Sequence, residues 1–104
     1  MNFICEPDLR EYMSKRGMRT IAVEIVTSDY SDFEISELHV HLVSDAQARV
    51  FREKKGYIGK RTDFGEVLLP PFRLEISDTV TFGLKKVWIF KSISYKGIEN
   101  PCRV

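Results

Sequence analysis

Apolar and polar residues alternate in several short segments of this chain, and a period of two is typical of β-strands that bury one face. In residues 20–27 the β-branched side chains of Ile21, Val23 and Ile25 share one face, which favours an extended backbone. Polar residues predict a loop at 28–36 and a turn at 77–78. Further strands are predicted at residues 38–42, 66–69, 72–76, 79–82 and 92–95. We therefore expect a mainly β chain.

Residues 87–90 are apolar without interruption, because Val87, Trp88, Ile89 and Phe90 follow one another. A strand that lacks a polar side is predicted to be buried on both faces, in the middle of a sandwich or a closed barrel. We therefore expect Val87, Trp88 and Phe90 to be core residues.

One amphipathic helix is predicted within residues 5–17. Pro7 suits the first helical position, where its missing N–H would have no partner, and Gly17 can adopt the left-handed conformation that ends a helix. Leu9, Tyr12 and Met13 are spaced three and four apart, so they form a single apolar stripe.

Residues 44–65 permit two interpretations. Ser44 and Gln47 fit a capping box at the start of a short helix. Three glycines within a stretch rich in Lys and Arg instead favour a long connection or an exposed hairpin. The pattern leaves both possibilities open.

The composition bounds the partners of the chain. Its 104 residues suit one domain that spans residues 1–104. The formal net charge is +1, whereas binders of nucleic acid or of membrane surfaces normally carry a clear basic excess, so we expect neither partner. No stretch approaches the ~18 apolar residues of a membrane span. Glu6 and Pro7 precede any signal-peptide core, which predicts a cytoplasmic protein.

Three stretches resemble the HesB-like domain, a family related to iron–sulfur carriers. Residues 9–17 are similar to its helix ending in glycine, residues 20–28 to its first strand and residues 89–98 to its terminal aromatic strand. Within the family, the chain looks most like the branch named for a paired-cysteine or selenocysteine motif. The resemblance implies a mainly β (α+β) fold, a distorted barrel or two-layer sandwich with one N-terminal helix.

The cluster-binding motif of that family is degenerate in this chain. The resemblance aligns residues 29–33 with a Gly-Cys-Ser-Gly-Phe segment of the carriers, which places Tyr30 at the cysteine position. Near the C-terminus, Cys102 stands where the carriers have two thiols. Iron in such clusters is held by about four thiolates, and a tyrosine with a pKa of about 10 is a poor substitute. We therefore expect no iron–sulfur cluster and no other cofactor.

His39 and His41 are candidates for binding a metal. Strand residues two apart project from the same face, so both imidazoles could reach one ion, with Cys5, Cys102 or an acidic residue as a further ligand. The alternative is a pair of solvent-facing imidazoles on an exposed sheet.

Basic and aromatic residues interleave in residues 49–64. Such a run can neutralise and stack on a nucleic acid, or it can form a solvated face or a protein-docking surface. The balanced net charge favours the second interpretation. The basic members are Arg49, Arg52, Lys54, Lys55, Lys60 and Arg61, and the aromatic members are Phe51, Tyr57 and Phe64.

The sequence contains no glycine-rich phosphate loop, no nucleophile elbow and no Cys–His pair at a recognisable catalytic spacing. We therefore expect a non-catalytic binding or accessory domain whose partner is another protein, with a homodimer as a further possibility. The alternatives are a metal-binding protein that uses His39 and His41, and a residual role in iron–sulfur cluster assembly.

Overall fold

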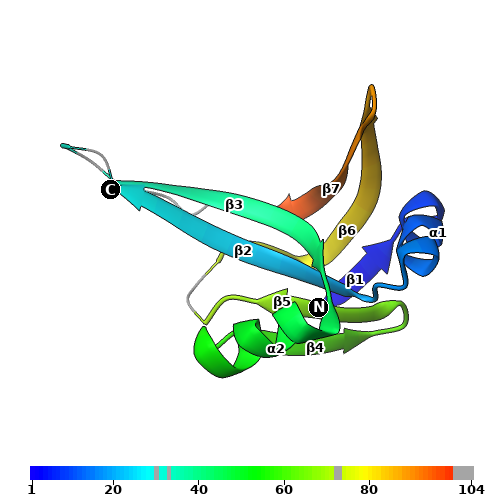
Figure 1. The fold of residues 1–104 in the computed structure, drawn as a ribbon, viewed down its shortest axis with the longest axis horizontal. Helices are drawn as coiled ribbons and strands as arrows, with labels where there is room; N and C mark the ends of the chain where they lie inside the picture. Colours follow the sequence, from blue (N-terminus) through cyan, green and yellow to red (C-terminus); the bar gives the residue numbers. More distant parts are fainter. Residues whose placement is uncertain (30, 33, 72–73, 100–104) are drawn as a thin grey trace.

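A computed structural model describes residues 1–29, 31–32, 34–71 and 74–99 of the chain (Figure 1). These residues form a mainly β fold of the α+β class, as the alternation predicted. In chain order, the elements are β1 (Asn2–Cys5), α1 (Pro7–Arg16), β2 (Thr20–Asp29), β3 (Glu34–Val43), α2 (Asp45–Lys54), β4 (Ile58–Thr62), β5 (Gly65–Leu69), β6 (Ile76–Val87) and β7 (Phe90–Ile98).

The strands form two mixed sheets. One has the order β1-β6-β7, and the other has the order β3-β2-β5-β4. The pairs β1–β6 and β2–β5 are parallel, and the remaining pairs are antiparallel. The short strand β1 has no counterpart among the predicted strands, because its pairing with β6 brings together residues that are far apart in sequence.

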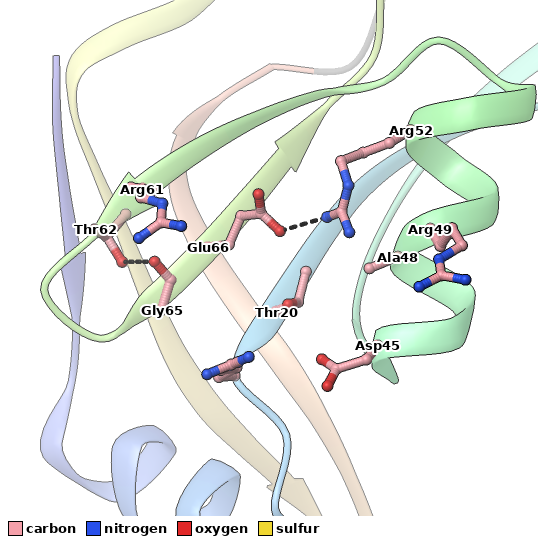
Figure 2. A pocket seen from close by; sticks show the side chains of 10 residues that line it. Thr20, Asp45, Ala48, Arg49, Arg52, Arg61, Thr62, Gly65 and Glu66 are labelled. Atoms are coloured by element: carbon pink, nitrogen blue, oxygen red, sulfur yellow. Dashed lines mark hydrogen bonds and ion pairs between the residues drawn. The ribbon is translucent and has the colours of Figure 1, made fainter.

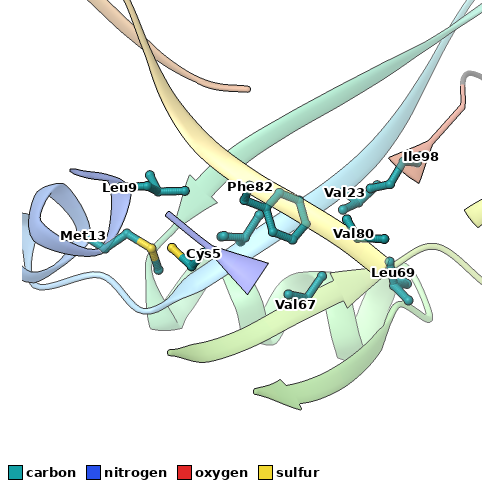
Figure 3. Packing of buried hydrophobic residues seen from close by; sticks show 10 residues of the cluster. Cys5, Leu9, Met13, Val23, Val67, Leu69, Val80, Phe82 and Ile98 are labelled. Atoms are coloured by element: carbon teal, nitrogen blue, oxygen red, sulfur yellow. The ribbon is translucent and has the colours of Figure 1, made fainter. Parts of the chain in front are cut away.

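The main core lies between the two sheets and α1 (Figure 3). Phe82 of β6 is fully buried at its centre, with Leu9 of α1, Ile21 of β2 and Val67 of β5. Ile21 and Val23 belong to the face of β2 that the alternation predicted to be buried. Burying each such side chain contributes about 1.5–3 kcal/mol, so this layer holds the sheets together.

The helix α1 confirms the first predicted helix and both of its ends. Pro7 is its first residue, and Gly17 ends it with a φ of 66°. The N–H of Gly17 donates to the carbonyl of Ser14, and the N–H of Met18 donates to that of Met13. Glycine adopts this left-handed conformation without a steric cost.

The helix α2 settles the interpretation of residues 44–65. The N–H of Gln47 donates to Ser44 Oγ at 3.2 Å, and the N–H of Ser44 donates to Gln47 Oε1 at 2.9 Å, so the capping box is complete. The β4–β5 hairpin follows the helix, which means that both interpretations hold in succession. The fold thus has a second helix besides the N-terminal one. The second helix covers a smaller core of Ala22, Val43, Ala48, Phe51, Tyr57 and Leu68.

Two predicted interruptions of the strands are wrong. The expected loop at residues 28–36 is shorter, because β2 continues to Asp29 and β3 begins at Glu34. The Thr27 and Ser36 hydroxyls lie 3.1 Å apart and form a cross-strand hydrogen bond. The expected turn at residues 77–78 is part of β6, which begins at Ile76. Ladder hydrogen bonds and partner strands outweigh the local turn preference of these polar residues. Of the strand predicted at 72–76, residues 72 and 73 lie outside the described residues.

The prediction that residues 87–90 form a buried strand is also wrong. Trp88 and Ile89 form the turn between β6 and β7, where 93% of Trp88 and 79% of Ile89 are exposed. Val87 and Phe90 flank the turn and are exposed as well. A short apolar run that no polar residue interrupts has no periodicity. Its pattern therefore does not distinguish a buried strand from an exposed turn.

Candidate functional site

A pocket of about 560 Å³ opens between α2 and the adjoining ends of β2, β4 and β5 (Figure 2). All of these elements belong to the sheet that α2 covers or to α2 itself. The volume falls within the range of pockets that hold small molecules. The lining residues are Arg19, Thr20, Asp45, Ala48, Arg49, Arg52, Arg61, Thr62, Gly65 and Glu66.

The floor of the pocket depends on a close approach between β2 and β5. The N–H of Glu66 donates to the carbonyl oxygen of Arg19 at 2.9 Å, and Thr20 pairs with Glu66 in the parallel register. Gly65 has a φ of 143°, and a Cβ at this position would overlap the Arg19 carbonyl oxygen. Glycine is therefore required there for both conformation and space.

The turn before Gly65 is closed by a side chain. The Thr62 hydroxyl donates to the carbonyl oxygen of Gly65 at 3.0 Å, as Figure 2 shows. The same hydroxyl accepts a hydrogen bond from the N–H of Phe64 at 3.2 Å. This arrangement fixes the end of β4, which carries Arg61 into the wall of the pocket.

Two of the four arginines in the pocket already have carboxylate partners. Arg52 donates to Glu66 Oε1 at 2.7 Å across the pocket, and Arg49 lies 3.7 Å from Glu53 on the same helix. Arg19 and Arg61 form no ion pair with any residue that the structure describes. The lining thus contains four guanidinium groups and two carboxylates, so it is positively charged.

This charge arrangement suits an anionic ligand. A guanidinium group stays protonated at all physiological pH values, and its planar donors match the oxygens of a phosphate or carboxylate in a bidentate fashion. The Glu66 side chain is partly buried, with 26% exposed, which reduces the screening of its charge by solvent, whereas the Arg52 side chain is 42% exposed. At the N-terminus of α2, the Ser44 hydroxyl already accepts from the N–H of Gln47, and Asp45 places a carboxylate in the first turn, so the attraction comes mainly from the arginines.

The structure brings together only part of the basic run that the sequence singled out. Arg49, Arg52 and Arg61 line the pocket, whereas Lys55 binds Glu24 at 3.2 Å and Lys60 is not part of the lining. The aromatic residues of the run are not free to stack on bases. Phe51 on the inner face of α2 and Tyr57 after it are buried in the smaller core, and Phe64 is partly buried.

Arg19 and Glu66 belong to the pocket but were not candidates from the sequence. Neither residue lies in a recognisable motif, and their proximity follows from the parallel pairing of β2 with β5. The available signal was Gly65, because an isolated glycine before a strand often marks a close backbone approach.

His39 and His41 project from one face of β3, as predicted, but each binds a separate carboxylate. His39 Nε2 lies 3.0 Å from Glu37 Oε2, and His41 Nε2 lies 3.0 Å from Glu24 Oε1. The described residues contain no group of three or more His, Cys, Asp or Glu side chains that could hold a metal ion. A metal site that uses both imidazoles therefore remains a prediction.

Glu24 connects His41 to α2. Burial raises the pKa of Glu24, but the hydrogen bonds from His41 and Lys55 outweigh burial, so its pKa lies below the ordinary value. Lys55 also lies 4.6 Å from the centre of the Phe51 ring, a favourable cation–π distance. The network thus has a structural role in holding α2 against the sheet.

The structure describes one of the two cysteines of the chain. Cys5 is buried in the main core with 4% exposed, and burial raises the pKa of its thiol to about 11. It is therefore a protonated core residue at neutral pH and a poor metal ligand. Tyr30 and Cys102, the positions identified by the HesB-like resemblance, lie outside the described residues.

Within the described part of the chain, neither helix has the length and apolar character needed to cross a membrane. Comparisons with protein-family models, with curated proteins and with solved structures find no match. The function is therefore inferred from the residues themselves.

Proposed function

We propose that this chain is a non-catalytic binding domain whose arginine-lined pocket binds a small phosphorylated ligand. The observation that carries the proposal is the pair of Arg19 and Arg61, which line a pocket and have no ion-pair partner among the described residues. Both guanidinium groups have donors available for a ligand. The second pair of arginines supplies further positive charge at the same place.

A phosphate is the anion that these residues fit best. It presents several oxygens to donors that come from different directions, and the arginines are contributed by the segment before β2, by α2 and by β4. The Asp45 carboxylate and the Thr20 hydroxyl belong to the same lining and can bind the hydroxyl groups of a sugar or an alcohol. These polar groups suit a phosphate ester better than an apolar acid.

The dimensions favour a small molecule over a nucleic acid. A pocket of about 560 Å³ holds one compact ligand. Binding of single-stranded nucleic acid uses an extended basic groove with aromatic side chains exposed for stacking. The candidate aromatics Phe51 and Tyr57 are instead buried.

The same proposal includes a HesB-like origin without cluster ligation. It is supported by the presence of only two cysteines in the whole chain, one of which is Cys5 in the apolar core. Anaerobic reconstitution with iron and sulfide should leave the protein colourless. A stoichiometric visible absorption band that disappears in Cys102→Ser would contradict this part of the proposal.

Isothermal titration calorimetry with inorganic pyrophosphate tests the pocket directly. Wild-type protein should bind one equivalent, and Arg61→Gln should raise the Kd about tenfold, because one charge-assisted hydrogen-bond donor is lost. Lys60→Gln is the matched control, since it removes the same charge from the neighbouring position of β4, outside the pocket lining.

The control should change the Kd by less than about twofold, because an exposed charge outside the pocket is screened by salt. Equal losses in the two variants would mean that net charge alone attracts the anion. Absence of binding to the wild-type protein would refute the proposed function.

A further inference from the structure

The tip of the β6–β7 hairpin presents four neighbouring apolar side chains to solvent. Val87, Trp88, Ile89 and Phe90 are 55%, 93%, 79% and 69% exposed, respectively. Figure 1 shows this end of the hairpin extending away from the body of the molecule. Single exposed apolar residues are common, but a contiguous group of large ones marks an interaction site.

The backbone of the turn adds a second observation. Trp88 has a φ of 58°, and it is the only residue other than glycine with a positive φ in the described part of the chain. A bulky side chain is disfavoured in this conformation, for which glycine, asparagine and aspartate are the usual residues. The position thus holds a large aromatic ring at the outermost point of the hairpin at a steric cost.

The hairpin is also strongly basic. Residues 79–98 contain no Asp or Glu, and their charged side chains are Lys85, Lys86, Lys91 and Lys96. Lys86 and Lys91 are directly opposite each other in the β6–β7 register, one residue behind the apolar tip. Like charges that face each other across a sheet are destabilising unless an anion lies nearby.

We propose that this tip inserts into the headgroup region of an anionic lipid bilayer. Trp88 suits the boundary between water and acyl chains because its ring is apolar and its N–H is polar. Ile89 and Phe90 would enter the apolar layer, while Lys86 and Lys91 would lie at the level of the lipid phosphates. Each part of the tip then meets a matching layer of the membrane.

This proposal departs from the expectation that the net charge of +1 set for the whole chain. Electrostatic attraction acts over about 8 Å at physiological salt, so a surface responds to the local charge of the hairpin rather than to the sum over the molecule. The acidic residues all lie outside residues 79–98, and Glu11 of α1 is close enough to interact electrostatically with Lys86, so four lysines of the hairpin face at least one nearby carboxylate and keep a local positive excess.

A bilayer fits the shape of this feature better than a protein partner. Specific protein interfaces bury about 800 Å² on each side, usually on broad complementary surfaces. The tip is a convex two-residue turn with apolar side chains on both strands and a pair of lysines behind it. Such a shape penetrates a soft layer more readily than it covers a rigid surface.

Fluorescence of the full-length chain with lipid vesicles tests the proposal. Trp88 is the only tryptophan, so its emission reports on the tip alone. Vesicles that contain about 30% phosphatidylserine in phosphatidylcholine should shift the emission to the blue and bind at least about tenfold more tightly than pure phosphatidylcholine vesicles. Raising the salt concentration should weaken the binding.

Two test variants and their two controls keep Trp88 as the reporter. Lys86→Gln combined with Lys91→Gln should weaken binding to the anionic vesicles by roughly 25-fold, at about fivefold for each lysine. The matched control is Lys54→Gln combined with Lys60→Gln, which removes equal charge elsewhere and should have little effect. Ile89→Ser should weaken insertion, whereas Ile58→Ser, at a residue on β4 that is 53% exposed, should not.

An unchanged emission spectrum of the wild-type protein with anionic vesicles would overturn the proposal, as would equal binding by both lysine double variants. A blue shift that appears without lipid as the protein concentration rises, together with a dimeric mass, would also overturn it. In that case the tip binds a second copy of the chain.

Discussion

Arg61 lies directly opposite Glu66 in the β4–β5 pairing, yet the Glu66 carboxylate forms its ion pair with Arg52 of α2, at 2.7 Å. Arg61 is thereby left without a carboxylate partner among the residues that the structure describes. A carboxylate that could have neutralised Arg61 instead connects the sheet to the helix. The pocket consequently keeps an available guanidinium group on each side of its floor.

Replacing Glu66 should strengthen anion binding. Glu66→Gln removes one negative charge from the lining and releases Arg52, so the Kd for pyrophosphate should fall about threefold, by Coulombic estimates for partly screened charges. Stability should fall by less than about 1 kcal/mol, because Arg52 is substantially exposed. Calorimetry measures the first effect and urea unfolding the second.

The control is Glu11→Gln, which releases Lys15 on α1, away from the pocket. It should leave the Kd unchanged. Weaker binding by Glu66→Gln would mean that the carboxylate contacts the ligand or that the ion pair organises the site.

Gly65→Ala should destabilise the fold and deform the pocket. The new Cβ would meet the Arg19 carbonyl oxygen in a conformation that already disfavours side chains, so the loss should be at least about 2 kcal/mol. Gly17→Ala is matched in having a positive φ, but no atom lies within 4 Å of its added Cβ. It should cost only about 1 kcal/mol. If urea unfolding shows that the two variants lose the same free energy of unfolding, the close approach to Arg19 is not the reason for glycine at position 65.

Cys5 should be inert to thiol reagents while the protein is folded. In a Cys102→Ser background, Ellman's reagent should give no reaction near pH 8 and one equivalent in urea, because burial keeps the thiol protonated with a pKa of about 11. Rapid modification of the folded protein would show that the thiol is accessible.

The raised pKa of the Cys5 thiol predicts that the protein loses stability at alkaline pH. Above pH 9.0 the unfolded thiol ionises, whereas the folded thiol remains protonated until about pH 11. The contribution of this residue to the free energy of unfolding is therefore fully present below pH 9 and decreases as the pH rises from 9 to about 11. Cys5→Ala should lack this component of the alkaline slope in unfolding experiments.

The lowered pKa of Glu24 predicts that stability decreases as the pH falls into the acid range. Its folded pKa is lowered below the ordinary value of 4.5, so its contribution is present above that pH and is lost as the pH falls through the folded pKa. Glu24→Gln should cost about 1–2 kcal/mol at pH 7, because hydrogen bonds to a charged partner are lost. The difference from the wild-type protein should shrink near pH 3. A constant difference between pH 7 and pH 3 would contradict the charge-based role.

The parts of the fold that depend on local chemistry could be read from the sequence. Pro7 and Gly17 bound a helix through backbone geometry that neighbours within a few residues determine. The capping box of Ser44 and Gln47 is equally local. The alternation at Ile21 and Val23 identified the face of β2 that meets the main core, whereas Ala22 on the other face is buried in the smaller core under α2.

Features that depend on pairing at long range could not be read in this way. Arg19 and Glu66 meet only because β2 and β5 are parallel neighbours in one sheet. The uninterrupted apolar run at residues 87–90 predicts a buried strand, but the position of Trp88 follows from the β6–β7 register, which places the turn at Trp88 and Ile89. The pocket required knowledge of both strand order and register.

Nuclear magnetic resonance titration of the ¹⁵N-labelled protein with pyrophosphate tests the central claim most directly. Saturable shifts should appear at the backbone amides of Thr20, Ala48, Gly65 and Glu66, which line the pocket, and should be much smaller in Arg61→Gln at the same ligand concentration. Shifts confined to other surfaces, or no saturable shifts at these amides, would contradict the assignment of an anion-binding pocket.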